Sequence, residues 1–134
     1  MSTNTKLFGL HRLINQHFDD AVEQTRMVLQ AGGFEILADI NLTKVLEKKA
    51  QEHIRRHRIF VVCYPELADR ALTIAPLSGA LLLCNVALSH LDDMQVEVTI
   101  TVPLTELGAP LEPHLKPIAD ELSSRLEHVI FALK

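Results

Sequence analysis

Two cysteines carry the most reactive side chains of this chain, and each lies in an apolar run. Cys63 ends the run 59–63, and Cys84 lies inside the run 80–88. If these runs are neighbouring strands, the two thiols could meet on one face of a sheet and bind a soft metal or form a reversible disulfide. No Cys-x-x-Cys pair is present, and zinc would need two further ligands. Because cysteine commonly serves as a small buried apolar residue, the sequence favours simple packing.

Asn85, which follows Cys84, is a stronger physical anomaly than either thiol. A buried amide without hydrogen-bond partners costs about 1–3 kcal/mol. We therefore expect Asn85 either to tie down a neighbouring loop or to face a pocket.

The pair His53 and His57 has the spacing of two residues on one face of a helix, where both could chelate a metal. Arg55, Arg56 and Arg58 surround the pair and would repel a cation. The sequence therefore favours a solvated helix end over a metal site.

Positive charge is concentrated between Lys44 and Arg58. This segment holds six of the 13 basic residues and two acidic ones, whereas the rest of the chain holds seven basic and 15 acidic residues. Such a segment could bind nucleic acid or another polyanion. It lacks the interleaved aromatic residues that stack on bases, which disfavours nucleic acid. A solvated face, or a face that pairs with the acidic part of a second subunit, is the favoured interpretation.

Composition bounds the class of protein. The chain has 134 residues, 48% of them hydrophobic and 22% charged, which is ordinary for a globular protein, and we expect one domain over residues 1–134. No apolar run reaches the roughly 20 residues that span a bilayer, and the first residues do not resemble a signal peptide. Two cysteines without an export signal indicate reduced thiols in the cytoplasm.

Hydrophobic periodicity predicts the elements that hold these residues. A helix ends at Gly32-Gly33, a second begins after an Asn41 cap, and a third has Pro65 in its first turn. The run 59–63 is apolar throughout, which is typical of a strand buried on both faces. The segment 65–79 is long enough to cross between parallel strands. The expected strands are 6–14, 34–38, 59–63, 80–88 and 96–102.

These elements predict an α+β fold. We expect a single-layer, antiparallel-rich mixed sheet of about five strands with helices packed on it. The last two strands should form a hairpin around Asp92-Asp93. The chain should end in a long amphipathic helix, whose apolar stripe runs from Leu115 to Leu133.

Four short motifs resemble the bacterial and archaeal family called domain of unknown function 302. They are Gly-Gly-Phe at 32–34, Cys-Tyr-Pro-Glu-Leu-Ala at 63–68, Arg-Ala-Leu at 70–72 and Leu-Leu-Leu-Cys-Asn-Val at 81–86. The family usually has asparagine where Tyr64 stands and proline where Leu83 stands, so the chain departs from its pattern at both positions. The resemblance covers residues 18–130. It implies an α+β fold and self-association, and the family has no assigned activity.

The sequence therefore predicts a small-ligand-binding or interaction module without assigned catalysis. It forms a homodimer, and its candidate ligand-binding residues are Cys63, Tyr64, Cys84 and Asn85. A thiol-based redox or metal-binding role of the two cysteines is the first alternative. Weak polyanion binding between Lys44 and Arg58 is the second. The sequence identifies no catalytic residue, metal site or cofactor.

Overall fold

A computed structural model describes residues 9–48 and 55–134 of the chain. Its strands are β1 (Leu10–Ile14), β2 (Glu35–Asn41), β3 (His57–Cys63), β4 (Cys84–Asp92) and β5 (Gln95–Thr101). Its α-helices are α1 (Phe18–Ala31), α2 (Leu42–Glu47), α3 (Pro65–Ile74), α4 (Ala109–Leu111) and α5 (Lys116–Ala132). Three further helical turns connect them: η1 (Pro76–Leu81), η2 (Leu104–Gly108) and η3 (Pro113–Leu115).

The five strands form one sheet in the order β1-β5-β4-β3-β2. Within the described residues every neighbouring pair is antiparallel. The expected α+β fold is confirmed. The segment 65–79 does not cross between parallel strands as its length would allow, because β3 and β4, the strands on either side of it, run in opposite directions.

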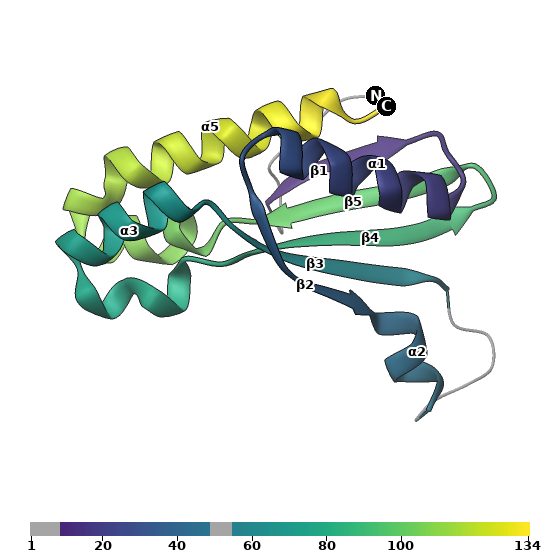
Figure 1. Ribbon diagram of the computed structural model, residues 1–134, viewed down its shortest axis with the longest axis horizontal. Coiled ribbons are helices and arrows are strands. Elements are labelled where there is room, and N and C mark those ends of the chain that lie inside the picture. The colour runs from purple at the N-terminus through teal and green to yellow at the C-terminus, as the bar shows by residue number, and fades with distance from the viewer. Residues whose placement is uncertain (1–8, 49–54) are drawn as a thin grey trace.

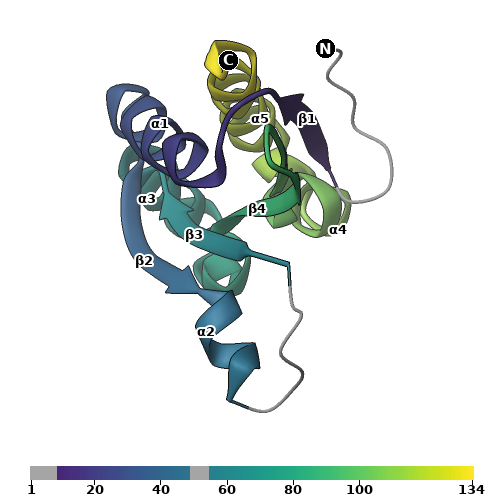
Figure 2. The same cartoon turned by 90° about the vertical axis from the view of Figure 1, so that its right-hand side faces the viewer.

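Helices α1 and α5 lie side by side on one face of the sheet (Figures 1 and 2). The core forms between them and that face. The alternation predicted for the fifth strand is confirmed, since Val96, Val98 and Ile100 are fully buried. The stripe of the C-terminal helix is confirmed too, and its buried members are Leu115, Ile118, Leu122, Leu126, Val129, Ile130 and Leu133.

Local signals fix the ends of several helices. Gly33 has φ +92°, and its N–H donates to the carbonyl of Gln30 at 3.1 Å while Phe34 N–H donates to that of Leu29 at 3.0 Å. These two bonds close α1 in a Schellman motif. The Asn41 side chain accepts from the backbone N–H of Lys44 at 3.2 Å, which confirms the predicted cap of α2. Pro65 begins α3, as predicted.

Three boundaries differ from the prediction. The fourth strand begins at Cys84, because residues 80 and 81 belong to the 3-10 turn η1. The third strand begins at His57, so the expected helix does not reach this residue, and its partner His53 lies outside the described residues. The second strand, β2, runs to Asn41 rather than ending at residue 38, and it carries a bulge between Ile36 and Ala38.

Among the described residues, no helix combines the length and the apolar character that crossing a membrane would require.

Candidate functional site

The strand register separates the two thiols. Cys84 lies opposite Val62, whereas Cys63 lies opposite Glu35 on the other neighbouring strand. Because successive side chains of a strand point to opposite faces, Cys84 points into the core and Cys63 points away from it. Cys84 is 1% exposed, and Cys63 is half-buried. The possibility that both thiols meet on one face of the sheet is therefore not realised, and both are free.

Neither thiol is activated by its surroundings. Burial raises the pKa of Cys84 to about 12, and the neighbouring Cys63 and Glu106 act in the same direction. Burial and the Glu35 carboxylate also raise the pKa of Cys63. Because the thiolate is the nucleophile and the metal ligand, these shifts disfavour redox and metal chemistry at neutral pH. Within the described residues, no group of three His, Cys, Asp or Glu side chains could hold a metal ion.

Asn85 is exposed on the face of the sheet that points away from the helices. Its strand partners on that face are Val61 and Thr101. Water can reach its amide, so the cost of burial that made this residue anomalous in the sequence does not arise. The signal was misleading because an apolar run does not show which face of a strand is buried.

Tyr64 packs on the helical side of the molecule. Its ring meets Phe34 edge-on at a centroid distance of 5.2 Å, and the Arg125 guanidinium lies 4.6 Å from its centroid. Arg125 also donates two hydrogen bonds to one carboxylate oxygen of Glu121, from Nε at 3.2 Å and from Nη2 at 2.9 Å. These contacts hold Arg125 in place beside a groove.

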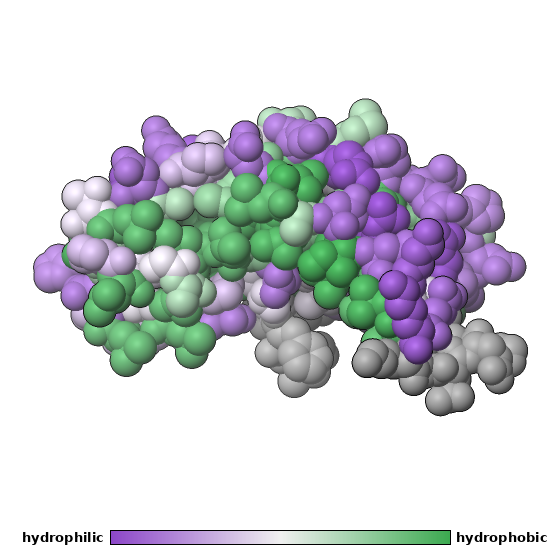
Figure 3. Space-filling view, turned by 60° about the horizontal axis from the view of Figure 1, so that its bottom comes forward, coloured by the Kyte–Doolittle hydropathy of each residue, from purple (hydrophilic) through white to green (hydrophobic). Residues whose placement is uncertain are grey.

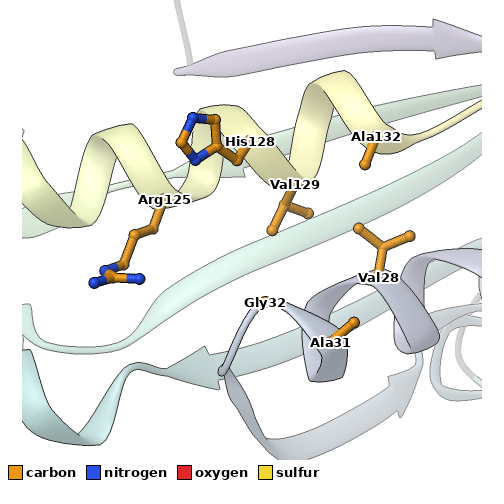
Figure 4. Close-up of a pocket in the computed structure, with 7 residues that line it drawn as sticks. All are labelled: Val28, Ala31, Gly32, Arg125, His128, Val129 and Ala132. Carbon is orange, nitrogen blue, oxygen red and sulfur yellow. The ribbon is translucent and has the colours of Figure 1, made fainter.

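The groove lies between α1 and the second half of α5 and has a volume of about 460 Å³ (Figure 4). Val28 and Val129 point toward one another across it, while His128 points away from α1. Its walls are largely small apolar side chains, and Arg125 supplies a positive charge at one end. The lining residues are Val28, Ala31, Gly32, Arg125, His128, Val129 and Ala132. Of the four candidate residues, only Tyr64 touches a residue of this lining.

Ion pairs neutralise part of the basic segment. Arg58 donates to both carboxylate oxygens of Asp39, at 2.6 and 3.0 Å, and Arg56 donates to Asp19 at 2.6 Å. The hydrogen bond from Arg58 holds the pKa of Asp39 below its usual value. These two arginines are therefore less available to a polyanion than the sequence suggested. Lys44 and Lys48 remain exposed.

The face of the sheet opposite the helices is apolar at its centre. We call this surface the open sheet face. Its central side chains alternate with core residues along β2, β3 and β4, and they are Ala38, Ile40, Ile59, Val61, Cys63 and Ala87. Polar side chains surround them, including His11, His57, Asn85, Ser89, Glu97, Thr99 and Thr101. Figure 3, which brings the underside of the molecule forward, shows hydrophobic residues gathered in one area that runs from the α3 end toward the middle of the molecule.

The open sheet face is the surface that the sequence analysis failed to identify. The signal was present, because the run 59–63 was expected to be buried on both faces. Among residues 9–48 and 55–134, helices cover one face of this strand: Phe60 and Val62 are fully buried, whereas Ile59 and Val61 on the other face are half-buried. This partly exposed apolar side of β3 is the physical anomaly of the described fold.

Comparisons with known proteins agree with this architecture. The family model described as "Domain of unknown function DUF302" matches residues 11–133. A solved structure of an uncharacterized conserved protein DUF302 from Bacillus stearothermophilus is similar, with a TM-score of 0.79 and 23% sequence identity. The similarity covers 92% of this chain and 98% of that one. No curated protein matches the chain.

Proposed function

The chain belongs to the family of domain of unknown function DUF302, and from this premise we propose that it is a non-catalytic interaction module that forms a homodimer through its open sheet face. One observation carries the proposal: residues 59–63 of β3 are apolar on both sides, and within the part of the chain that the structure describes only one side is fully buried. The family description assigns no activity, so the function has to be argued from this surface.

Removal of the open sheet face from water would stabilise a complex. An antiparallel sheet with one face in solvent usually places polar residues there, whereas β3 presents Ile59, Val61 and Cys63. Each Å² of apolar surface that is buried contributes roughly 25 cal/mol. The face has an apolar centre and a polar rim, which is the usual composition of protein–protein interfaces.

A second copy of the chain fits this face best. A two-fold dimer uses the same patch on both subunits, so the patch has to match itself. The six central side chains are uncharged at neutral pH, because the pKa of Cys63 is raised. These six side chains therefore bring no like charges together, while the Glu35 carboxylate, which lies opposite Cys63 in the strand pairing, is a charged group beside them. Cys63 and Asn85, two of the four candidate residues, would then lie in the interface.

The test is the oligomeric state of three proteins, measured by analytical ultracentrifugation over a range of concentrations. We expect the unaltered chain to be dimeric and Val61→Glu to be monomeric, because a carboxylate at the centre of an apolar interface loses its hydration. Met27→Glu is the matched control, because Met27 is exposed on α1, away from the open sheet face, and this variant should stay dimeric. Circular dichroism should show native helix content in all three.

Two results would refute the proposal. The first is an unaltered chain that stays monomeric at every concentration. The second is a Val61→Glu protein that is folded and as dimeric as the Met27→Glu control.

We propose small-ligand binding in the α1–α5 groove as a second function, carried by the volume and lining of that groove. About 460 Å³ lies within the usual range of ligand sites, roughly 300–1,000 Å³. The apolar walls suit the tail of a small amphipathic ligand, whereas Arg125 at one end is already paired with Glu121. Octanoate should raise the Tm of the unaltered protein and leave that of Ala31→Phe unchanged, because the larger side chain fills the groove. Equal shifts, or no shift in either protein, would exclude this site.

A further inference from the structure

We propose that the two copies of the dimer lie head to tail, so that α2 of each copy packs against the η1 end of its partner. This inference rests on the proposed homodimer and adds its arrangement. It is argued from three features of the chain: an uncovered helix at one end, uncovered leucines at the other, and the distribution of charge between them.

Helix α2 is held firmly, yet none of its six residues is buried. Val45 is 52% exposed, and Leu42 and Leu46 are half-buried. The Thr43 hydroxyl accepts from the backbone N–H of His57 at 2.7 Å and donates to the His57 carbonyl at 3.3 Å, which fastens the helix to β3. A helix this short draws its stability from packing rather than from its own hydrogen bonds. Its apolar residues therefore need a cover.

Figures 1 and 2 place α2 on the same side of the sheet as the open sheet face, away from α1 and α5. Along the long axis of the molecule, α2 lies at one end, and α3 with the turn that follows it lies at the other (Figure 1). The open sheet face spans the distance between them.

The opposite end exposes large apolar side chains. Leu77 of η1 is 96% exposed, and Leu83, which lies just before β4, is 42% exposed. The hydrophobic area in Figure 3 begins at this end and continues onto the sheet. A leucine this exposed gains nothing from its own fold, but it can pack against an apolar helix.

Two-fold symmetry can bring the α2 end of one copy onto the η1 end of the other. A two-fold axis between two stacked sheets can run across the long axis or along it. Across the long axis, it places α2 of each copy over the η1 end of the partner. Along the long axis, it places the α2 helices of both copies at the same end of the dimer. In the first arrangement the contact between α2 and the η1 end forms twice, once at each end of the dimer, as an interface between identical surfaces requires.

Charge favours the first arrangement. Lys44, Glu47 and Lys48 are exposed on and just after α2, two positive charges and one negative, whereas Glu66, Asp69 and Arg70 are exposed on α3 at the other end, two negative charges and one positive. Head-to-tail packing brings these opposite charges together, while the alternative brings the lysines of two copies together. Complementary charge of this kind selects the orientation of partners more than it adds affinity.

Disulfide cross-linking between two differently labelled chains tests the arrangement. Both chains carry Cys63→Ser, and Cys84 is buried. One chain carries Val45→Cys and the other Leu77→Cys. We expect mild oxidation to cross-link the mixture and to leave the Val45→Cys chain alone uncross-linked. Met27→Cys replaces Val45→Cys in the matched control mixture, which should not cross-link.

The outcomes separate this inference from the proposed dimer. Cross-linking of the Val45→Cys chain alone, or an uncross-linked mixture in a sample that sediments as a dimer, overturns the head-to-tail arrangement and leaves the dimer intact. A monomeric chain overturns both. As an independent measurement, Val45→Asp should weaken dimerisation at least about tenfold, because it removes a buried valine from the interface twice. An unchanged dissociation constant would overturn the inference.

Discussion

Gly33→Ala should destabilise the protein more than any other single-methyl addition at the end of α1. Gly33 has φ +92°, a conformation that costs an L residue about 1–2 kcal/mol. A Cβ built there would lie 2.9 Å from Cε1 of Tyr64 and 3.3 Å from its hydroxyl oxygen. The Tyr64 ring cannot withdraw freely, because Phe34 and Arg125 contact it.

The backbone strain at residue 33 and the clash with Tyr64 add to a measurable loss of stability. Overpacking of this kind typically costs about another 1–3 kcal/mol, and we therefore expect Gly33→Ala to lower the free energy of unfolding by about 2–5 kcal/mol. Gly32→Ala is the matched control. Its Cβ would lie 3.3 Å from the Val28 carbonyl oxygen and 3.4 Å from Val129 Cγ2, and its φ of −81° suits alanine. Its cost should stay below about 1 kcal/mol, because alanine also restricts the unfolded chain.

Urea denaturation followed by circular dichroism measures both values. Repeating Gly33→Ala in a Tyr64→Ala background separates the two costs, because the clash disappears and the strain of about 1–2 kcal/mol remains. An equal cost of Gly33→Ala in both backgrounds would refute the clash. A cost no larger than that of Gly32→Ala would refute the whole argument.

Three further predictions concern titration and capping. In the monomeric Val61→Glu variant a thiol reagent should label Cys63 without unfolding, more slowly than an ordinary thiol because its pKa is raised, and should label Cys84 only after unfolding; equal native labelling of both thiols would contradict the assigned faces. Asp39→Asn should lower the free energy of unfolding by about 1–2 kcal/mol at neutral pH, because it removes charged hydrogen bonds from Arg58. The pKa of Asp39 is lower in the folded protein than in the unfolded chain, so the stabilisation is complete above the unfolded pKa and is lost as pH falls through the folded pKa. The free energies of unfolding of the two proteins should therefore converge in acid. A difference that stays constant with pH would contradict the ion pair. Asn41→Ala should cost about 1 kcal/mol through the lost cap of α2, measured by thermal unfolding, and no change in Tm would contradict the capping role.

Local rules predicted the parts of the fold that local chemistry determines. Gly33 ends α1, Asn41 caps α2 and Pro65 begins α3, because each acts on backbone groups within a few residues. The strict alternation of β5 predicted its buried face for the same reason. The start of β4 was misplaced at residue 80, because an apolar run looks the same in a strand and in a 3-10 turn.

The candidate site depended on long-range register, which the sequence does not show. A shift of one residue moves a side chain to the other face, so the pairing of Cys84 with Val62 rather than Cys63 decided which thiol is buried. The interpretation of Asn85 as a buried amide failed for the same reason, because the register places its side chain on the exposed face. The chain did carry one long-range signal, the two-sided apolar character of β3, and its uncovered half now motivates the proposed dimer.

The bulge in β2 bears on how far such an assembly can grow. A flat edge strand invites further chains to add to the sheet, and open-ended addition produces fibres. Here one edge strand is interrupted between Ile36 and Ala38, and the other, β1, has five residues with Arg12 at its centre. Both edges are thus poor templates for strand addition, which leaves stacking of faces as the route to association. Two copies that stack face to face cover each other's apolar surface and leave no third position, so assembly stops at a closed pair.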